Sequence, residues 1–214
     1  MNDATLIVLA KAPVPGRSKT RLSPPLSLTA ASLVAEACLG DTLEAVAATP
    51  VTRRVIALEG RAGAWLPPGI EVVPQTSGGL ADRLQGAFED ALPPALLIGM
   101  DSPQVTPAYL SEALTALASP GVDAVLGLTL DGGYWAVGLR ESCPNAFAGV
   151  PMSTRGTAVA QLHRFARLGL QCQMLLQLRD IDYFSDALEV ANQVPGSRLA
   201  NVIGRITSAR SVVS

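Results

Sequence analysis

The chain has 214 residues, a formal net charge of −2 and 16% charged residues, while 49% of its residues are hydrophobic. Charged residues make up roughly 25% of a typical soluble domain, so this composition indicates a large buried core. The slightly negative charge excludes the broad basic surface of a general nucleic-acid binder, and no apolar run approaches the roughly 18 residues that span a membrane. We therefore expect neither a nucleic-acid partner nor a membrane partner.

The cysteines and the N-terminal segment predict a cytoplasmic protein. Cys38, Cys143 and Cys172 are odd in number and far apart, which is typical of buried thiols in a reducing compartment and not of disulfides or a zinc site. The apolar segment after Asp3 is short and lacks a small-residue cleavage site, unlike a signal peptide. The apolar composition leaves room for a homodimer, although no residue identifies its interface.

Short apolar strands alternate with amphipathic helices along the chain. The stretch TLIVLA is apolar on both faces, as a central parallel strand should be, and Ala35, Leu39 and Leu43 line one face of the first helix. Thr106 and Pro107 mark a helix start. Strands are predicted at 5–10, 53–58, 70–75, 95–100, 122–130, 134–139 and 171–178, and helices at 28–47, 78–92, 106–119, 157–169 and 184–194.

This alternation predicts an α/β fold with three α/β/α layers and a mostly parallel sheet. No repeat or linker divides the chain, so we expect one domain at 1–194, followed by a C-terminal extension at 195–214 that forms a short helix or a tail. Ligands of such sheets bind beyond the carboxyl ends of the strands. The residues that follow each strand are therefore the candidates for function.

Four cations follow the first strand: Lys11, Arg17, Lys19 and Arg21, in the segment AKAPVPGRSKTRL. The segment lacks the glycines of a G-x-x-x-x-G-K-[ST] phosphate loop, and its prolines remove backbone N–H donors. Four cations in one loop nevertheless suit a diphosphate or triphosphate bound by side chains. The alternative is a solvated basic loop.

Carboxylates follow three later strands. Asp101 ends the apolar strand ALLIGM, where an unpaired buried carboxylate is costly, and it suits a magnesium ligand or, alternatively, a turn or helix cap. Asp131 opens the turn DGGYW, which is equally typical of a hairpin. Asp180 and Asp182 follow the last strand, where alternation predicts that only one faces the site and that the other can cap the last helix.

A glycine pair opens the second helix. The backbone N–H groups of Gly78 and Gly79 suit an anion or a base edge, and Arg83 lies one turn further; the alternative is a glycine-rich helix entry with a surface arginine. The single histidine, His163, falls in mid-helix and is predicted to be structural or exposed. Neither G-x-S-x-G nor G-x-G-x-x-G occurs, which argues against an acyl-transfer hydrolase and a dinucleotide enzyme.

Six motifs together resemble the bacterial DUF2064 family: AKAPVPGRSKTRL, GGLADRL, GMDSPQVTP, DGGYWAVGL, PMST and RDID. The likeness covers about 6–190, and the family is labelled as glycosyltransferases of the GT-A, nucleotide-diphospho-sugar transferase fold. The KTRL loop and the strand-end aspartates are more distantly similar to those of 2-phospholactate guanylyltransferases and molybdenum-cofactor nucleotidyltransferases. The resemblance implies a single Rossmann-like GT-A domain.

The resemblance also implies roles for individual residues. Asp101 and Asp182 would be the metal ligands, with Mg²⁺ or Mn²⁺ as cofactor, and Lys19, Arg21 and Asp101 would act in catalysis. The nucleotide would be bound by Lys11, Arg17, Lys19, Arg21, Gly78, Gly79, Leu80 and Arg83. The acceptor pocket would be lined by Asp131, Gly132, Gly133, Tyr134, Ser153 and Thr154.

Two positions depart from the family pattern. Met152 stands where the family often has tryptophan, which changes a contact to the acceptor. Tyr183 stands where the family often has threonine, which leaves open the capping of the last helix and the choice between Asp180 and Asp182 as second metal ligand.

Residues and resemblance together predict a metal-dependent transferase that acts on a nucleotide. Four loop cations suit a leaving pyrophosphate, and GMDSP offers only one carboxylate, so we expect nucleotidyl transfer from an NTP to a small phosphorylated or anionic acceptor. Glycosyl transfer from a nucleotide sugar, which the family label favours, is the first alternative. A nucleotide-binding protein without catalysis is the second. The base, the sugar and the acceptor are not specified by the sequence.

Overall fold

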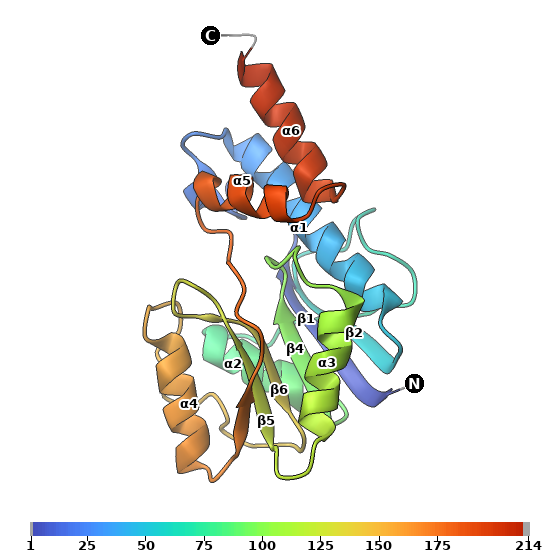
Figure 1. Cartoon of the computed structure of the whole chain (residues 1–214), viewed down its shortest axis with the longest axis vertical. Coiled ribbons are helices and arrows are strands. Elements are labelled where there is room, and N and C mark those ends of the chain that lie inside the picture. The colour runs from blue at the N-terminus through green and yellow to red at the C-terminus, as the bar shows by residue number, and fades with distance from the viewer. Residues whose placement is uncertain (1, 212–214) are drawn as a thin grey trace.

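A seven-stranded sheet forms the centre of the computed structural model, which describes residues 2–211 (Figure 1). The strand order is β3-β2-β1-β4-β6-β5-β7. All neighbouring strands are parallel except β6, which is antiparallel to β4 and β5. The strands are β1 (Asn2–Lys11), β2 (Val51–Glu59), β3 (Glu71–Pro74), β4 (Ala95–Gly99), β5 (Ala124–Leu128), β6 (Tyr134–Leu139) and β7 (Cys172–Met174).

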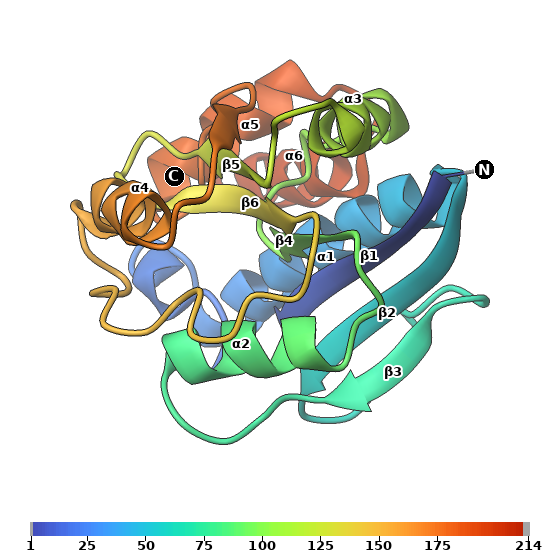
Figure 2. The ribbon, with the colours of Figure 1, turned by 90° about the horizontal axis from the view of Figure 1, so that it is seen from below.

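Helices cover both faces of this sheet (Figure 2). Helices α1 and α3 pack on one face, and α2 and α4 pack on the other. A short 3₁₀ helix, η1, lies in the loop after β1, and α5 and α6 pack against α1. The helices are η1 (Thr20–Leu22), α1 (Leu28–Ala48), α2 (Leu80–Glu89), α3 (Pro107–Ala118), α4 (Thr157–Arg167), α5 (Phe184–Gln193) and α6 (Arg198–Ser211).

Alternation along β1 divides the core into two layers. Leu6 and Val8 belong to the cluster with α1 and α3, whereas Ile7 belongs to the cluster with α2 and α4. Successive strand residues point to opposite faces, so an all-apolar strand is stable only when both faces are covered. The predicted three-layer α/β/α fold with a mostly parallel sheet is confirmed.

The last strand is shorter than its sequence predicts. Within the predicted strand at 171–178, only β7 pairs continuously with β5, and pairing returns as a single bridge between Thr129 and Leu178. Leu176, between these two parts, is 55% exposed. The apolar residues at 171–178 therefore lie along a partly covered edge of the sheet and not in a central strand.

The C-terminal residues form a longer helix than the short one expected. In α6, Leu199 and Ile203 are buried with α1 and α5, and the N–H groups of Arg198 and Leu199 donate to the carboxylate of Asp41 at 2.9 and 3.0 Å. These bonds satisfy two donors of the first turn. The rest of the predicted tail, 212–214, lies outside the described residues.

Among residues 2–211, no helix combines the length and the apolar character needed to cross a bilayer.

The three cysteines are free thiols, of which Cys38 is buried beneath the loop that carries η1. Burial raises the pKa of the Cys38 thiol despite the nearby Lys19 ammonium. A neutral thiol at this place behaves as a small apolar side chain.

Gly132 brings two loops of the fold into close contact. Its φ is +92°, and a Cβ added there would lie 2.1 Å from the carbonyl oxygen of Arg155. The N–H of Ala158 at the start of α4 donates to the Gly132 carbonyl at 3.0 Å. The first glycine of DGGYW therefore allows the β5–β6 turn to pack against the segment before α4.

We predict that Gly132→Ala lowers the free energy of unfolding by at least about 2 kcal/mol, because it combines a strained φ with a backbone clash. Gly196→Ala is the matched control, since Gly196 also has a positive φ but has open space around it. Urea denaturation of both variants measures the difference. Equal losses in the two variants would mean that the contact with Arg155 contributes nothing.

Candidate functional site

The carboxyl ends of the parallel strands meet at one edge of the sheet, as the topology requires. A cavity of about 360 Å³ opens there, and we call it the central pocket. Its walls come from the ends of β1 and β4, the start of α2, the β5–β6 turn and the segment before α4. The predicted site residues that line it are Lys11, Leu80, Arg83, Asp101, Asp131, Gly133, Tyr134, Ser153 and Thr154.

Lys19 forms a buried ion pair beside the central pocket. Its ammonium lies 2.9 Å from Asp101 Oδ2, its side chain is 8% exposed, and it also donates to the carbonyl of Ile181. Burial acts against the charged form, but the attraction of Asp101 and Asp180 outweighs it and raises the pKa of Lys19. Lys19 does not line the central pocket. Its predicted contact with phosphate therefore requires this ion pair to open.

A second ion pair joins the same loop to the segment before α5. Arg21 donates through Nη1 to Asp182 Oδ2 at 2.7 Å. A nearby bond from Gln104 Nε2 to the carbonyl of Arg179, at 2.8 Å, ties that segment to the loop after β4. Two of the predicted cations thus lie against two of the predicted carboxylates.

Three carboxylates gather between these ion pairs. Asp131, Asp180 and Asp182 each place an oxygen within 4.8 Å of the others. The pKa of Asp180 is raised to about 6, because burial and the charges of Asp101 and Asp182 together outweigh the lowering effect of Lys19. The expectation that only one of Asp180 and Asp182 faces the site is wrong, because residues 179–183 do not form a regular strand.

The carboxylates fit a hard divalent cation. Carboxylate oxygens are the ligands that Mg²⁺ and Mn²⁺ prefer, and Asp131, Asp180 and Asp182 supply three of them. Asp101 is not in this group, but its Oδ1 is buried without a hydrogen-bond partner among the described residues. A buried carboxylate oxygen without a hydrogen-bond partner is destabilising. Asp101 Oδ1 is therefore suited to bind a ligand that supplies this partner.

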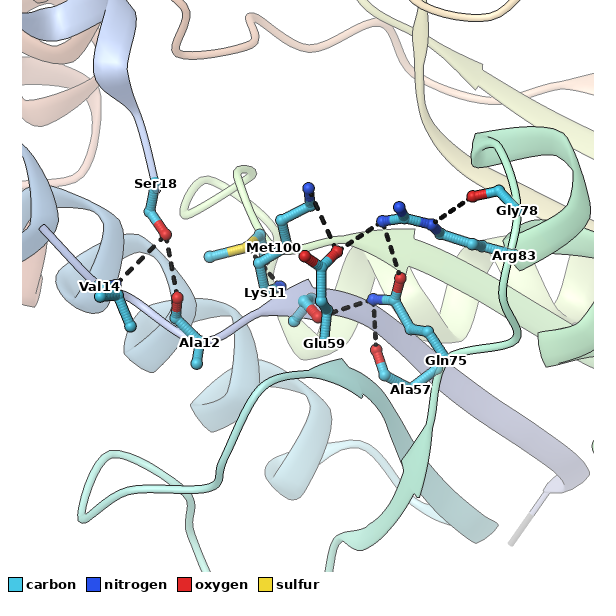
Figure 3. A network of polar contacts seen from close by, with 11 residues as sticks. Lys11, Ala12, Val14, Ser18, Ala57, Glu59, Gln75, Gly78, Arg83 and Met100 are labelled. Atoms are coloured by element: carbon cyan, nitrogen blue, oxygen red, sulfur yellow. Dashed lines mark hydrogen bonds and ion pairs between the residues drawn. The ribbon is translucent and has the colours of Figure 1, made fainter. Parts of the chain in front are cut away.

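A polar network joins three residues that line the central pocket, Lys11, Gln75 and Arg83 (Figure 3). Glu59, at the end of β2, pairs with Lys11 at 3.2 Å and with Arg83 at 2.6 Å. Desolvation raises the pKa of Glu59, but these two cations together lower it. Gln75 donates to the carbonyls of Ala10 and Ala57 at 2.7 and 2.9 Å, so it ties the pocket wall to β1 and β2.

Gly78 and Gly79 lead into the start of α2 in this structure. The N–H of Gly79 donates to Asp82 at 2.8 Å, and Arg83 Nε donates to the Gly78 carbonyl at 3.2 Å. Neither glycine lines the central pocket, whereas Leu80 and Arg83 do. Arg17 is exposed, and its guanidinium has no hydrogen-bond or ion-pair partner among residues 2–211. The roles predicted for Arg17, Gly78 and Gly79 stay predictions.

A second cavity of about 810 Å³ adjoins the central pocket, and we call it the outer pocket. Asp131, Asp180, Ser153 and Thr154 line both cavities. The residues that line only the outer pocket are Arg21, Leu130, Gly132, Arg155, Asp182 and Tyr183.

Both departures from the family pattern have a structural account. Met152 lines the central pocket, where its sulfur accepts a 3.8 Å hydrogen bond from Tyr134. Burial raises the pKa of Tyr134, which keeps its hydroxyl protonated as a donor. Tyr183 precedes α5 with an exposed side chain, and Asp186 caps the helix in its place by accepting from the N–H of Tyr183 at 2.8 Å.

Sequence reasoning missed Glu59, Gln75 and Arg155 as residues of this site. Glu59 is the last residue of β2, so the rule that ligands bind beyond strand ends could have found it. Gln75 follows β3 and was open to the same inference. Arg155 lies in an irregular segment far from any strand end, and no local signal marks it.

Fold and site together define a class: a doubly covered, mostly parallel sheet with a cation-bearing loop after β1 and carboxylates beyond later strands is the nucleotide-diphospho-sugar transferase fold. The chain belongs to the family described as "Uncharacterized protein conserved in bacteria (DUF2064)", whose model matches residues 42–154. The family predicted from the six motifs is thereby confirmed. No curated protein matches the sequence.

Solved structures share this fold. A Desulfovibrio desulfuricans G20 protein, provisionally named a nucleotide-diphospho-sugar transferase, has a TM-score of 0.86 at 23% identity, over 97% of this chain and 96% of that one. CMP:2-keto-3-deoxy-manno-octonic acid synthetase complexed with CTP gives 0.55 at 11%, over 90% and 100%. Rv0371C of Mycobacterium tuberculosis H37Rv, complexed with manganese, gives 0.51 at 19%, over 90% and 100%. At these identities the likeness establishes the fold.

We predict that Asp180→Asn raises the free energy of unfolding at pH 7.5 by roughly 1–3 kcal/mol, because ionised Asp180 opposes folding by 1.36 kcal/mol for each unit of its raised pKa. Between about pH 4, the unfolded pKa, and about pH 6, the folded state holds a proton that the unfolded state lacks. Through this group, wild-type stability therefore increases as the pH falls from 7.5 to 5, and the variant lacks that increase.

Urea denaturation at pH 5 and pH 7.5 measures this effect. Glu36→Gln is the control, since Glu36 is an exposed acid on α1. An Asp180→Asn variant that is less stable than wild type at pH 7.5 would show that the carboxylate is needed structurally and would contradict the prediction.

Proposed function

We propose that this chain is a divalent-metal-dependent transferase that moves a nucleotidyl group from an NTP to a small phosphorylated or anionic acceptor. The observation that carries the proposal is that cations of one loop meet carboxylates of later strand ends beside a cavity. Lys19 lies 2.9 Å from Asp101 and Arg21 lies 2.7 Å from Asp182, next to the central pocket of about 360 Å³.

This arrangement suits phosphate chemistry because both members of each ion pair can bind a substrate group: the cations can bind phosphate, and the carboxylates can bind a metal. Phosphate oxygens can replace the carboxylates around Lys19 and Arg21, and a hard cation can replace those two side chains around Asp101 and Asp182. Nucleotidyl transfer releases pyrophosphate, whose charge must be neutralised as it leaves. Lys11, Lys19 and Arg21 supply that neutralisation from one side.

In the proposed assignment, Asp101 and Asp182 would hold the metal, as the family pattern implies, and Asp131 and Asp180, which cluster with Asp182, would be further candidate ligands. A bound Mg²⁺ or Mn²⁺ would supply a Lewis acid for the phosphates. The manganese complex of Rv0371C supports a divalent ion in this fold. The CTP complex of the synthetase supports a nucleotide substrate.

The acceptor oxygen needs no catalytic histidine under this proposal. His163, the single histidine of the sequence, is exposed on α4 and lines neither pocket. An acceptor whose attacking oxygen is already anionic has no proton to lose, so positioning and charge neutralisation are sufficient. Tyr134, Ser153 and Thr154 are proposed to position the acceptor, together with the backbone of Gly132 and Gly133.

Glycosyl transfer from a nucleotide sugar is the second candidate. The name given to the Desulfovibrio protein, which shares 96% of its length with this chain at a TM-score of 0.86, favours it. A nucleotide-binding protein without catalysis is the remaining alternative. The expected cytoplasmic location belongs to the same proposal, since its nucleotide substrates are cytoplasmic.

We predict a metal-dependent rise in melting temperature with one of the four NTPs. A ligand that binds only the native state raises the melting temperature by an amount set by its concentration relative to Kd. The panel consists of four NTPs and the common nucleotide sugars, each with and without Mg²⁺. A shift with a nucleotide sugar and with its nucleoside diphosphate product, and none with an NTP, would favour glycosyl transfer instead.

Asp101→Asn is expected to lower the turnover rate by a factor of roughly 100 or more while the fold survives, because it removes the charge that pairs with Lys19 and would hold the metal. Pyrophosphate release from the NTP selected by the panel measures the rate. Asp3→Asn is the control, as Asp3 lies at the opposite end of β1 and is exposed. Full activity of Asp101→Asn would show that this site is not the active site.

A further inference from the structure

The outer pocket has one arginine, Arg155, and apolar groups that the proposed nucleotide site does not use, and it shares Arg21 with that site. It shares one wall with the central pocket through Asp131 and Asp180, and it extends away from that wall over about 810 Å³. Arg21, Arg155, Tyr183 and Leu130 line only this outer cavity. A substrate that meets the nucleotide at the shared wall would lie on these four side chains.

Arg155 is held by its backbone and free at its side chain. Its carbonyl packs against Gly132, and Ser153, two residues before it, is held at a φ of +57°. Thr154 accepts from the N–H of Gly156 at 3.2 Å and donates its own N–H to Thr157 at 3.0 Å. The guanidinium of Arg155 has no hydrogen-bond or ion-pair partner within the described part of the chain. An arginine whose backbone is held in position and whose guanidinium is unpaired is suited to bind an oxyanion.

Arg21 offers further donors to the same cavity. Only its Nη1 is bonded to Asp182, whereas a guanidinium carries five N–H donors. Two arginines can therefore bind one anion together. A phosphomonoester has three terminal oxygens, enough to accept from both arginines and still present one oxygen to the shared wall, whereas a carboxylate has only two.

The charges of the outer pocket favour binding of a metal before binding of an anion. Arg21 and Arg155 supply two positive charges, and Asp131, Asp180 and Asp182 supply three negative charges. The lining therefore carries one net negative charge and repels an anion, while one divalent cation on the carboxylates reverses the sign. Anion binding in this cavity should accordingly depend on the metal.

Apolar surface completes the outer pocket. The side chains of Tyr183 and Leu130 are 58% and 56% exposed at its edge. Exposed aromatic and aliphatic groups beside paired cations are typical of a site for an anion with an organic body.

We propose that the outer pocket is the acceptor subsite and that it takes a phosphomonoester. Its phosphate is bound by Arg155 and by the free N–H groups of Arg21, and its carbon body lies on Tyr183 and Leu130. This inference rests on the proposed nucleotidyl transfer. One phosphate oxygen forms a bond to the α-phosphorus of the NTP, the bond from that phosphorus to the α–β bridging oxygen breaks, and pyrophosphate leaves with the electron pair.

Inorganic phosphate and phenyl phosphate test the subsite with the full chain. Inorganic phosphate presents the same attacking oxygens without the carbon body, and its attack on an NTP yields pyrophosphate and a nucleoside diphosphate whose β-phosphate comes from the acceptor. ³²P-labelled phosphate should therefore appear in the nucleoside diphosphate. Calorimetric titration of phenyl phosphate should give binding with Mg²⁺ and none without it, and benzoate should not compete.

Arg155→Gln should raise the KM for phosphate and the Kd for phenyl phosphate at least tenfold, with the KM for NTP changed less than twofold. Arg167→Gln is the matched control, since Arg167 is an exposed arginine at the other end of α4 that lines neither pocket. It should leave all three constants unchanged.

The outcomes separate this inference from the proposed function. If an NTP binds with Mg²⁺ but phenyl phosphate does not, or if Arg155→Gln binds phenyl phosphate as wild type does, the acceptor subsite is wrong while the nucleotide site stands. Competition by benzoate would assign the cavity to carboxylates. If no NTP raises the melting temperature, the proposed function itself fails.

Discussion

The buried ion pair between Lys19 and Asp101 is the contact on which the arrangement of the site depends. It joins the loop after β1 to the end of β4, and the bond from Lys19 to the carbonyl of Ile181 adds the segment before α5. The Lys19 side chain is 8% exposed, and a buried ammonium is strongly destabilising without such partners. The same charge therefore holds together three segments that are distant in the sequence, and it does so at the edge where parallel strands open toward a ligand.

The site carries a cost in stability that its chemistry explains. Asp131, Asp180 and Asp182 lie close together, and the pKa of Asp180 is raised to about 6 because burial and two neighbouring carboxylates disfavour its charge. Folding alone would favour neutral side chains at these positions. Clustered carboxylates beside the ion pairs of Lys19 and Arg21 have a function if a metal and phosphate groups exchange these partners. This is the basis for proposing transfer of a nucleotidyl group.

The two pockets divide the substrate between them under this proposal. The central pocket is bounded on one side by the network of Lys11, Glu59, Gln75 and Arg83 (Figure 3), which is fixed to the ends of β1 and β2. The outer pocket shares Asp131 and Asp180 with the central pocket and is built mainly from loops. A rigid wall for the nucleotide and loop-borne walls for the acceptor are consistent with one fold that serves many acceptors.

Apolar periodicity, which is local, predicts the layers and most of the strands and helices, and the strand-end rule predicts the edge at which the site lies; β7 and α6 are the exceptions in length. The sequence by itself also identified the loop cations and the strand-end aspartates. Only the tertiary structure decided that Lys19 pairs with Asp101, that Asp180 and Asp182 both join Asp131, and that Arg155 enters the outer pocket. Alternation predicts side-chain direction only in regular strands, whereas residues 179–183 and 151–156 are irregular. Their course is set by long-range contacts, such as the packing of Gly132 on Arg155, which no local pattern contains.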